Sequence, residues 1–280
     1  MQNQFSFYQN YELIDCGDGR RLERFGDVIM DRPAKQAVFP KKAPQAIWDN
    51  PDAVFNDGWS FKKDLPETLP FDMGTAKMGL RFTSSGQIGI FPEQAFNWEW
   101  LLGLSQTLKG PVSTLNCFAY TGGSTLFASS LGEVCHVDGS KASVKWASDN
   151  VRLSGFESRS VRWIVDDVIT FMRREVKRGK KYNGLILDPP AFGRGKDGKV
   201  WSLKKDIVEL MSLSAELTSD DLKFFILSAH DPEFGEQELK EALLSIKNIR
   251  PNGVETIKLD IPSKSGNALP CGVCARFKNC

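Results

Sequence analysis

Short apolar runs alternate with amphipathic segments through the second part of the chain, from Pro111 onward. Several of these runs are continuously apolar, which is typical of strands that are covered on both faces. Alternation of strands and helices predicts a parallel sheet with helices on both sides. The predicted strands are VSTLNCF, EVCHVD (133–138), VRWIV (161–165), YNGLILD (182–188) and LKFFILSA (222–229).

The amphipathic segments between these runs have the signals of helix ends. Ser140 stands where a helix N-cap is expected, and Gly155 stands where the same helix should end. After a further helix at about 233–246, the extended segments VETIKLDI and LPCGVCARF follow, with the turn sequence PSKSGN between them. We expect these two segments to form a terminal antiparallel hairpin.

Residues 1–75 have a different pattern. They are rich in Asp, Gly, Pro and isolated aromatic residues, and they contain short strand-like runs such as YELIDC and DVIM. This pattern predicts a small β-rich domain. Because aromatic rings dominate small cores, Trp48, Trp59 and Phe61 are expected in its core rather than on a base-stacking surface.

Composition changes this picture little. Of the 280 residues, 41% are hydrophobic and 25% are charged, as in ordinary globular proteins, and the formal net charge is only +1. A nucleic-acid substrate would therefore be held by local contacts rather than by a broad basic field. The first ten residues, MQNQFSFYQN, do not resemble a signal peptide, and no run of about 18 apolar residues is present, so a cytoplasmic protein without a membrane span is expected.

The six cysteines do not suggest a metal site. Cys271 and Cys274 have the spacing of a ligand pair, but a structural zinc site needs four ligands and no second close pair supplies them. These two residues also lie in or beside a strand-like segment. We therefore expect reduced cysteines and no bound metal.

The loop after the first parallel strand, Thr121-Gly122-Gly123, is the first candidate binding site, since ligands of open α/β sheets bind beyond the carboxyl ends of the strands. Asp138 ends the second strand, where an acid can accept hydrogen bonds from two ribose hydroxyls. The sequence T-G-G-S-T-L replaces the G-x-G-x-x-G that seats a pyrophosphate, so a ligand without phosphates fits better. An ordinary tight turn and a strand-end acid are the alternatives.

Two further strand ends carry polar residues. Asp166 and Asp167 follow the third strand, where one can contact an adenine amino group while the other caps the next helix. The fourth strand ends in Asp188-Pro189-Pro190-Ala191-Phe192. Prolines cannot continue a sheet, so this segment should present its carbonyls and Asp188 at the ligand edge, with Phe192 able to stack on a planar base. A basic loop follows, and it is either a solvated loop or a phosphate contact; its cations are Arg194, Lys196, Lys199, Lys204 and Lys205.

Together these motifs resemble the class I S-adenosylmethionine-dependent methyltransferases. Within that class they are similar to the bacterial large-subunit ribosomal RNA methyltransferases that act on cytosine C5 or guanine N7. The matching segments are GQIGIFPEQ (86–94), LNCFAYTGG (115–123), VDGSKASVKWASDN (137–150), VDDV (165–168) and DPPAF (188–192). The resemblance implies a Rossmann-like α/β domain with a seven-stranded, mostly parallel sheet and a terminal antiparallel hairpin.

The resemblance also implies a domain plan and a set of site residues. Residues 1–75 would be the β-rich domain, 76–110 a connecting segment that helps enclose the cofactor, and 111–280 the catalytic domain that binds S-adenosylmethionine. Asp138 would hold ribose, Asp167 adenine, and Asp188 would lie between methyl donor and acceptor. The other expected cofactor contacts are Gln94, Phe118, Tyr120, Thr121, Gly122 and Ser140.

The end of the fifth strand departs from the cytosine-C5 enzymes. Those enzymes need a thiolate that adds to the ring, but this chain reads Leu227-Ser228-Ala229-His230. We therefore expect direct transfer to a nitrogen of an RNA base, which the resemblance implies to be in ribosomal RNA. The residues expected in the catalytic site are Asp188, Pro189, Pro190, Phe192 and His230. His230 can act as a base or hydrogen-bond donor, or simply cap the next helix. The alternatives are a methyltransferase for small molecules or proteins and a nicotinamide-dependent oxidoreductase.

Overall fold

The computed structural model describes residues 5–194 and 200–279 of the chain. By their internal contacts the residues form two compact units. The first comprises Met1–Ala95, Leu153–Gly155 and Asp260–Cys271, and the second comprises Phe96–Arg152, Phe156–Leu259 and Gly272–Cys280. The domain boundaries expected near residues 75 and 110 stay a prediction, and the segment 260–271 groups with the first unit.

The second unit is built on a seven-stranded sheet with the strand order β10-β9-β8-β11-β14-β18-β15. The first five strands in this order pair in parallel, and β18 is antiparallel to both β14 and β15. The predicted fold class and the terminal antiparallel pair are therefore confirmed. The strands are β8 (Val112–Cys117), β9 (Gly132–Asp138), β10 (Val161–Val165), β11 (Gly184–Leu187), β14 (Phe224–Ala229), β15 (Val254–Lys258) and β18 (Val273–Lys278).

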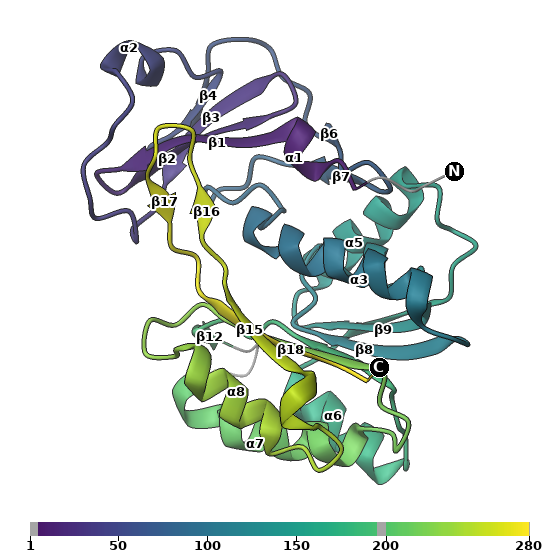
Figure 1. Ribbon diagram of the computed structural model, residues 1–280. Helices are drawn as coiled ribbons and strands as arrows, with labels where there is room; N and C mark the ends of the chain where they lie inside the picture. Colours follow the sequence, from purple (N-terminus) through teal and green to yellow (C-terminus); the bar gives the residue numbers. More distant parts are fainter. Residues whose placement is uncertain (1–4, 195–199, 280) are drawn as a thin grey trace. The chain divides into compact units, whose positions relative to one another are not determined.

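Helices cover both faces of this sheet (Figure 1). In the picture α3 and α5 lie on one side of the sheet, and α6, α7 and α8 lie on the other. The helices are α3 (Ala95–Thr107), α4 (Gly123–Ala128), α5 (Lys141–Leu153), α6 (Val168–Lys177), α7 (Leu203–Leu217) and α8 (Glu236–Leu244), with the 3-10 turn η2 (Pro251–Gly253) before β15. Two helix starts follow the sequence signals: Ser140 Oγ accepts from the N–H of Ser143, and Asp167 caps α6.

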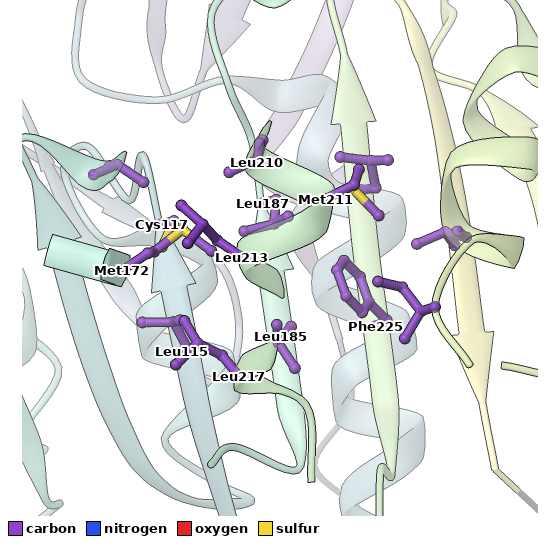
Figure 2. Close-up of a cluster of buried hydrophobic side chains, with 14 of the residues drawn as sticks. Leu115, Cys117, Met172, Leu185, Leu187, Leu210, Met211, Leu213, Leu217 and Phe225 are labelled. Carbon is purple, nitrogen blue, oxygen red and sulfur yellow. The ribbon is translucent and has the colours of Figure 1, made fainter. Parts of the chain in front are cut away.

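A large apolar cluster lies between the sheet and the helices of one face (Figure 2). Leucines and a phenylalanine of the central strands pack against leucines and methionines of α6 and α7, and all are buried. This packing covers one face of β11 and β14, and helices lie on the other side of the sheet as well, which explains why the apolar runs of these two strands are continuous. The residues labelled in Figure 2 are Leu115, Cys117, Met172, Leu185, Leu187, Leu210, Met211, Leu213, Leu217 and Phe225.

The first unit contains a five-stranded sheet with the order β1-β2-β3-β4-β5, in which only β3 and β4 pair in parallel. Trp48 is buried as expected, but Phe61 is 48% exposed, so its placement in the core was wrong. Phe61 lies on β5, the edge strand of this sheet, where its ring contacts that of Phe82 with centroids 4.9 Å apart and the rest of it is open to solvent. The elements are α1 (Phe7–Asn10), β1 (Tyr11–Gly17), β2 (Arg20–Phe25), β3 (Val28–Pro33), α2 (Gln45–Trp48), β4 (Ala53–Phe55), β5 (Trp59–Phe61), β6 (Leu69–Asp72), β7 (Lys77–Leu80), η1 (Pro92–Gln94), β16 (Ile261–Pro262) and β17 (Ala268–Leu269).

Among the described residues, no helix combines the length and the apolar character needed to cross a lipid bilayer.

Candidate functional site

The loop between β8 and α4 has an unusual backbone. Phe118, Tyr120 and Gly122 have φ values of 56°, 48° and 86°, so three of five successive residues are left-handed. For residues other than glycine this conformation costs on the order of 1–2 kcal/mol each, and such strain is concentrated at ligand sites. The following glycine has a different reason: a Cβ on Gly123 would lie 2.6 Å from Cζ2 of Trp98 on α3. Gly122 is therefore favoured by its positive φ, and Gly123 by the close approach of Trp98.

Asp138, at the end of β9, fixes this loop. One carboxylate oxygen accepts the backbone N–H of Tyr120 at 2.8 Å, and the other accepts the backbone N–H of Ser140 at 2.8 Å. Burial raises the pKa of Asp138, although the two N–H groups oppose that shift. A carboxylate has about four acceptor positions, so this side chain can accept two further hydrogen bonds.

Asp166 and Asp167 follow β10 and have different partners. Asp167 Oδ1 accepts from the backbone N–H of Thr170 at 2.9 Å and from its hydroxyl at 2.7 Å, which makes Asp167 the N-cap of α6. Asp166 accepts the N–H of Asp167 and pairs with Arg174. The residue that resemblance assigns to adenine is therefore also the helix cap, and Asp166 has an ion-pairing role.

Asp188 and His230 lie together although 42 residues separate them. They follow the neighbouring parallel strands β11 and β14, so both are at the carboxyl edge of the sheet. His230 Nε2 lies 2.8 Å from Asp188 Oδ1, and both side chains are about three-quarters buried. Because an ionised carboxylate only accepts, His230 donates from Nε2 when Asp188 is charged. This pair brings a proton-accepting group to the same sheet edge as Asp138.

The segment after Asp188 forms a short hairpin of β12 (Phe192–Arg194) and β13 (Val200–Ser202). Phe192 is 58% exposed on this hairpin. Of the predicted basic loop, residues 195–199 lie outside the described residues, and with them Lys196 and Lys199. Lys204 and Lys205 are exposed on the first turn of α7, and Lys204 pairs with Glu233.

Two polar residues of the parallel strands, His136 on β9 and Asn116 on β8, are buried. His136 Nδ1 lies 2.8 Å from Thr125 Oγ1, and burial lowers the pKa of His136 to about 3. Asn116 Nδ2 donates to the same hydroxyl at 2.9 Å, so the hydroxyl proton of Thr125 is directed to His136.

Within the described part of the chain, no three His, Cys, Asp or Glu side chains are arranged to hold a metal ion; Cys280 lies outside it.

A solved structure resembles this chain over nearly its whole length. It is the SAM-dependent methyltransferase from Agrobacterium tumefaciens, which is 34% identical and superposes with a TM-score of 0.88. The match covers 96% of this chain and 90% of that one. This chain belongs to the S-adenosylmethionine-dependent methyltransferases. The predicted enzyme class and cofactor are thereby confirmed, and the nicotinamide alternative is set aside.

More distant comparisons agree with the methyltransferase fold. SMU.776, solved in complex with SAH, is 17% identical with a TM-score of 0.73, covering 96% of this chain and 75% of its own, and this shows the fold alone. The ribosomal RNA large subunit methyltransferase I of Aeromonas salmonicida is 37% identical over 84 residues, which is 29% of this chain and 21% of that protein. The K/L enzyme of Methylococcus capsulatus is 35% identical over 96 residues, 34% of this chain and 13% of that protein. This chain therefore spans only a small part of these curated relatives, and no protein-family model matches it.

The residues of this methyltransferase at the sheet edge fit its cofactor. S-adenosylmethionine carries a ribose with two hydroxyls, and the remaining acceptor positions of Asp138 match two hydroxyl donors. It carries no phosphate, in agreement with a β8–α4 loop whose sequence lacks the pyrophosphate pattern. Gln94 is buried in η1 of the first compact unit, so its expected contact with the cofactor stays a prediction.

One residue of this region was missed by the sequence reasoning. Trp201 on β13 donates its indole N–H to the carbonyl of Pro190 at 2.7 Å, and its ring lies 5.0 Å from that of Phe118. A single tryptophan in a basic, glycine-rich segment has no periodic or motif signal. Only the pairing of β12 with β13 brings it beside the strand-end loops.

Proposed function

We propose that this methyltransferase transfers the methyl group of S-adenosylmethionine to a nitrogen of a base in ribosomal RNA. The RNA part of the proposal is supported by the curated relatives, which are ribosomal RNA large subunit methyltransferases I and K/L. The preference for nitrogen is supported by the pair of Asp188 and His230, and this pair is the observation that carries the proposal. Asp138 and Ser140, with the loop residues Phe118, Tyr120, Thr121 and Gly122 and the cap Asp167, are proposed to hold the cofactor.

Methylation at cytosine C5 needs a cysteine thiolate that can add to the ring. The end of β14 has serine, alanine and histidine instead. Cys117 is fully buried, and burial raises the pKa of its thiol well above the ordinary value. Cys274 on β18 is buried beside Asn97, and burial raises its pKa to about 12. Neither thiol is therefore suited to form a nucleophilic thiolate near neutral pH.

Transfer to nitrogen needs no covalent intermediate with the protein. When bound, the cofactor supplies a methyl group on a positively charged sulfur, which leaves as S-adenosylhomocysteine. The acceptor nitrogen gains the methyl carbon and must lose one proton. The carboxylate of Asp188 is proposed to accept the N–H hydrogen and the departing proton, while His230 orients that carboxylate through its 2.8 Å hydrogen bond.

The carbonyls of the 188–192 loop add a second constraint on the acceptor. Pro190 O accepts from Trp201, and Ala191 O accepts from the N–H of Leu203 at 3.1 Å. Among the described residues, no N–H or O–H group donates a hydrogen bond to the carbonyl of Pro189, and Pro189 is buried. We infer that Pro189 O and Asp188 together hold an amino or imino group. The exposed ring of Phe192 is proposed to stack on the base.

The test is methyl transfer from labelled S-adenosylmethionine to ribosomal subunits, total RNA and RNA-free extract, all from cells that lack this protein. Label in RNA that is recovered as an N-methylated nucleoside is the expected result. Recovery of 5-methylcytosine would overturn the argument from the missing cysteine. Label only in the RNA-free fraction would leave the enzyme class intact and reject RNA as the substrate.

Two variants test the proposed proton-accepting pair. Asp188→Asn should lower turnover by about 100-fold or more, since loss of a general base typically costs 10²–10⁴-fold, while leaving the dissociation constant of S-adenosylhomocysteine within about threefold. His230→Gln should have a smaller effect on turnover, because it removes the partner that orients the carboxylate. Full activity of the Asp188 variant would rule out this carboxylate as the proton acceptor.

A further inference from the structure

Trp201 joins two loops that meet at the carboxyl edge of the sheet. Its indole Nε1 donates to Pro190 O at 2.7 Å, within the loop that follows β11. Its ring packs against Phe118, with ring centroids 5.0 Å apart and planes inclined by 49°, in the loop that follows β8. One side chain thus holds the loop of the proposed acceptor site against the left-handed turn of the proposed cofactor site.

The loop of Pro189 and Pro190 has few other means of fixing its orientation. Two successive prolines have no backbone N–H, so the backbone of this segment can be hydrogen-bonded only through its carbonyls and its ends. The strand that carries Trp201 is itself anchored, because the N–H of Ser202 donates to Asp206 Oδ2 at 2.8 Å on α7. The N–H of Leu203, the next residue, holds the carbonyl of Ala191. The junction of β13 and α7 therefore acts as a rigid support for the proline loop.

The hydrogen bond from Trp201 also occupies one lone pair of the Pro190 carbonyl. Because Pro190 O and Ala191 O each already accept one hydrogen bond, an incoming N–H group meets less competition at the neighbouring Pro189 O. Loss of the indole donor would free Pro190 O and allow the loop to rotate. Since methyl transfer depends on alignment within a fraction of an ångström, a loosened loop should slow the reaction more than it weakens cofactor binding.

We propose that Trp201 is a positioning residue for methyl transfer, which holds the Pro189-Pro190 loop through the hydrogen bond from its indole N–H to Pro190 O and does not contact the methyl group itself. The proposal rests on the methyltransferase activity of the family and not on RNA as the substrate. Trp201→Phe removes the donor and keeps a ring against Phe118. Trp100→Phe is the matched control, because Trp100 is a half-buried tryptophan on α3 whose ring faces Arg276.

Methyl transfer is measured with whichever cell fraction the wild-type enzyme labels, so the result does not depend on the identity of the acceptor. For Trp201→Phe we expect kcat to fall about three- to tenfold, the usual effect of losing one neutral hydrogen bond. The KM for S-adenosylmethionine and the midpoint of thermal unfolding should change no more than in Trp100→Phe. In ¹⁵N-labelled wild-type protein, the indole N–H signal of Trp201 is identified as the one that Trp201→Phe lacks. Its proton should exchange with solvent more slowly than the indole proton of Trp100.

Equal kcat in Trp201→Phe and wild type would overturn the proposal. A fall in kcat accompanied by an equal loss of cofactor affinity and a large drop in thermal midpoint would also reject it, since the role would then be structural. Fast exchange of the Trp201 indole proton would show that the hydrogen bond to Pro190 is not kept in solution. Failure of RNA to be labelled, by contrast, bears only on the proposed substrate.

Discussion

The carboxylate of Asp138 gives the sharpest test of the proposed cofactor site. It accepts backbone N–H groups from Tyr120 and Ser140, each at 2.8 Å, and its remaining acceptor positions match the two hydroxyls of a ribose. A hydrogen bond to a charged group contributes about 1.5–3 kcal/mol. Asp138→Ala should therefore weaken S-adenosylhomocysteine binding by roughly 10- to 150-fold. Asp138→Asn should also weaken it, because an amide has a single acceptor oxygen for three or four donors.

Calorimetric titration with S-adenosylhomocysteine measures these affinities directly. Asp149→Asn is the control, since Asp149 lies on α5 and pairs with the surface cations Lys145 and Arg152. A ligand that lacks the ribose 2′-hydroxyl separates the ribose contact from the effect on the loop. If Asp138 binds ribose, the alanine variant should lose much less affinity for this analogue than for the natural ligand. Equal losses for both ligands would mean that Asp138 only supports the loop, and an unchanged affinity would move the ribose site elsewhere.

Three further predictions concern the packing around the site. Burial lowers the pKa of His136 to about 3, far below its value in the unfolded chain, so the unfolded chain takes up a proton between pH 7 and pH 5 that the folded state does not. The free energy of unfolding should therefore fall by about 2 kcal/mol over this range. His136→Gln should remove this pH dependence in denaturant titrations. Gly123→Ala should destabilise the protein by about 1–3 kcal/mol through its clash with Trp98, whereas Gly103→Ala, in open space within α3, should be neutral or stabilising by differential scanning calorimetry. Asn116→Asp should lower the thermal midpoint by several degrees, because it buries a carboxyl where Thr125 now accepts an amide donor; an unchanged midpoint would contradict that hydrogen-bond assignment.

The catalytic fold could be predicted because its signals are local. Continuous apolar runs identify strands that are buried on both faces, and each polar residue that follows such a run lies at the same edge of a parallel sheet. Asp138, Asp167 and Asp188 could be selected in this way from the sequence alone. The 2.8 Å contact between Asp188 and His230 is a consequence of the same rule, because β11 and β14 are neighbours in the sheet.

The first compact unit was harder to predict because long-range contacts hold it together. Glu23 is fully buried between Arg32 and the hydroxyl of Tyr11, and no periodic pattern in the sequence predicts a buried ion pair. The sequence PSKSGN (262–267) was predicted as a turn between two strands, and it is the turn that joins β16 to β17. In addition, the backbone N–H groups of Lys264 and Ser265 in this turn donate to carbonyls of β1, some 250 residues away. Such pairings depend on partners that no local window contains.

Asn116 shows how the role of a motif residue becomes clear only in the folded chain. In the sequence it lies within LNCFAYTGG (115–123), one of the segments that carry the resemblance to the methyltransferases. In the structure its amide donates to Thr125, whose hydroxyl proton is thereby directed to the neutral imidazole of His136. An amide suits this chain of hydrogen bonds because it is uncharged and can donate, whereas a buried carboxylate would have to be protonated or paired. The residue thus fixes α4 against β8 and β9, which is the support on which the strained loop of Phe118, Tyr120 and Gly122 is held.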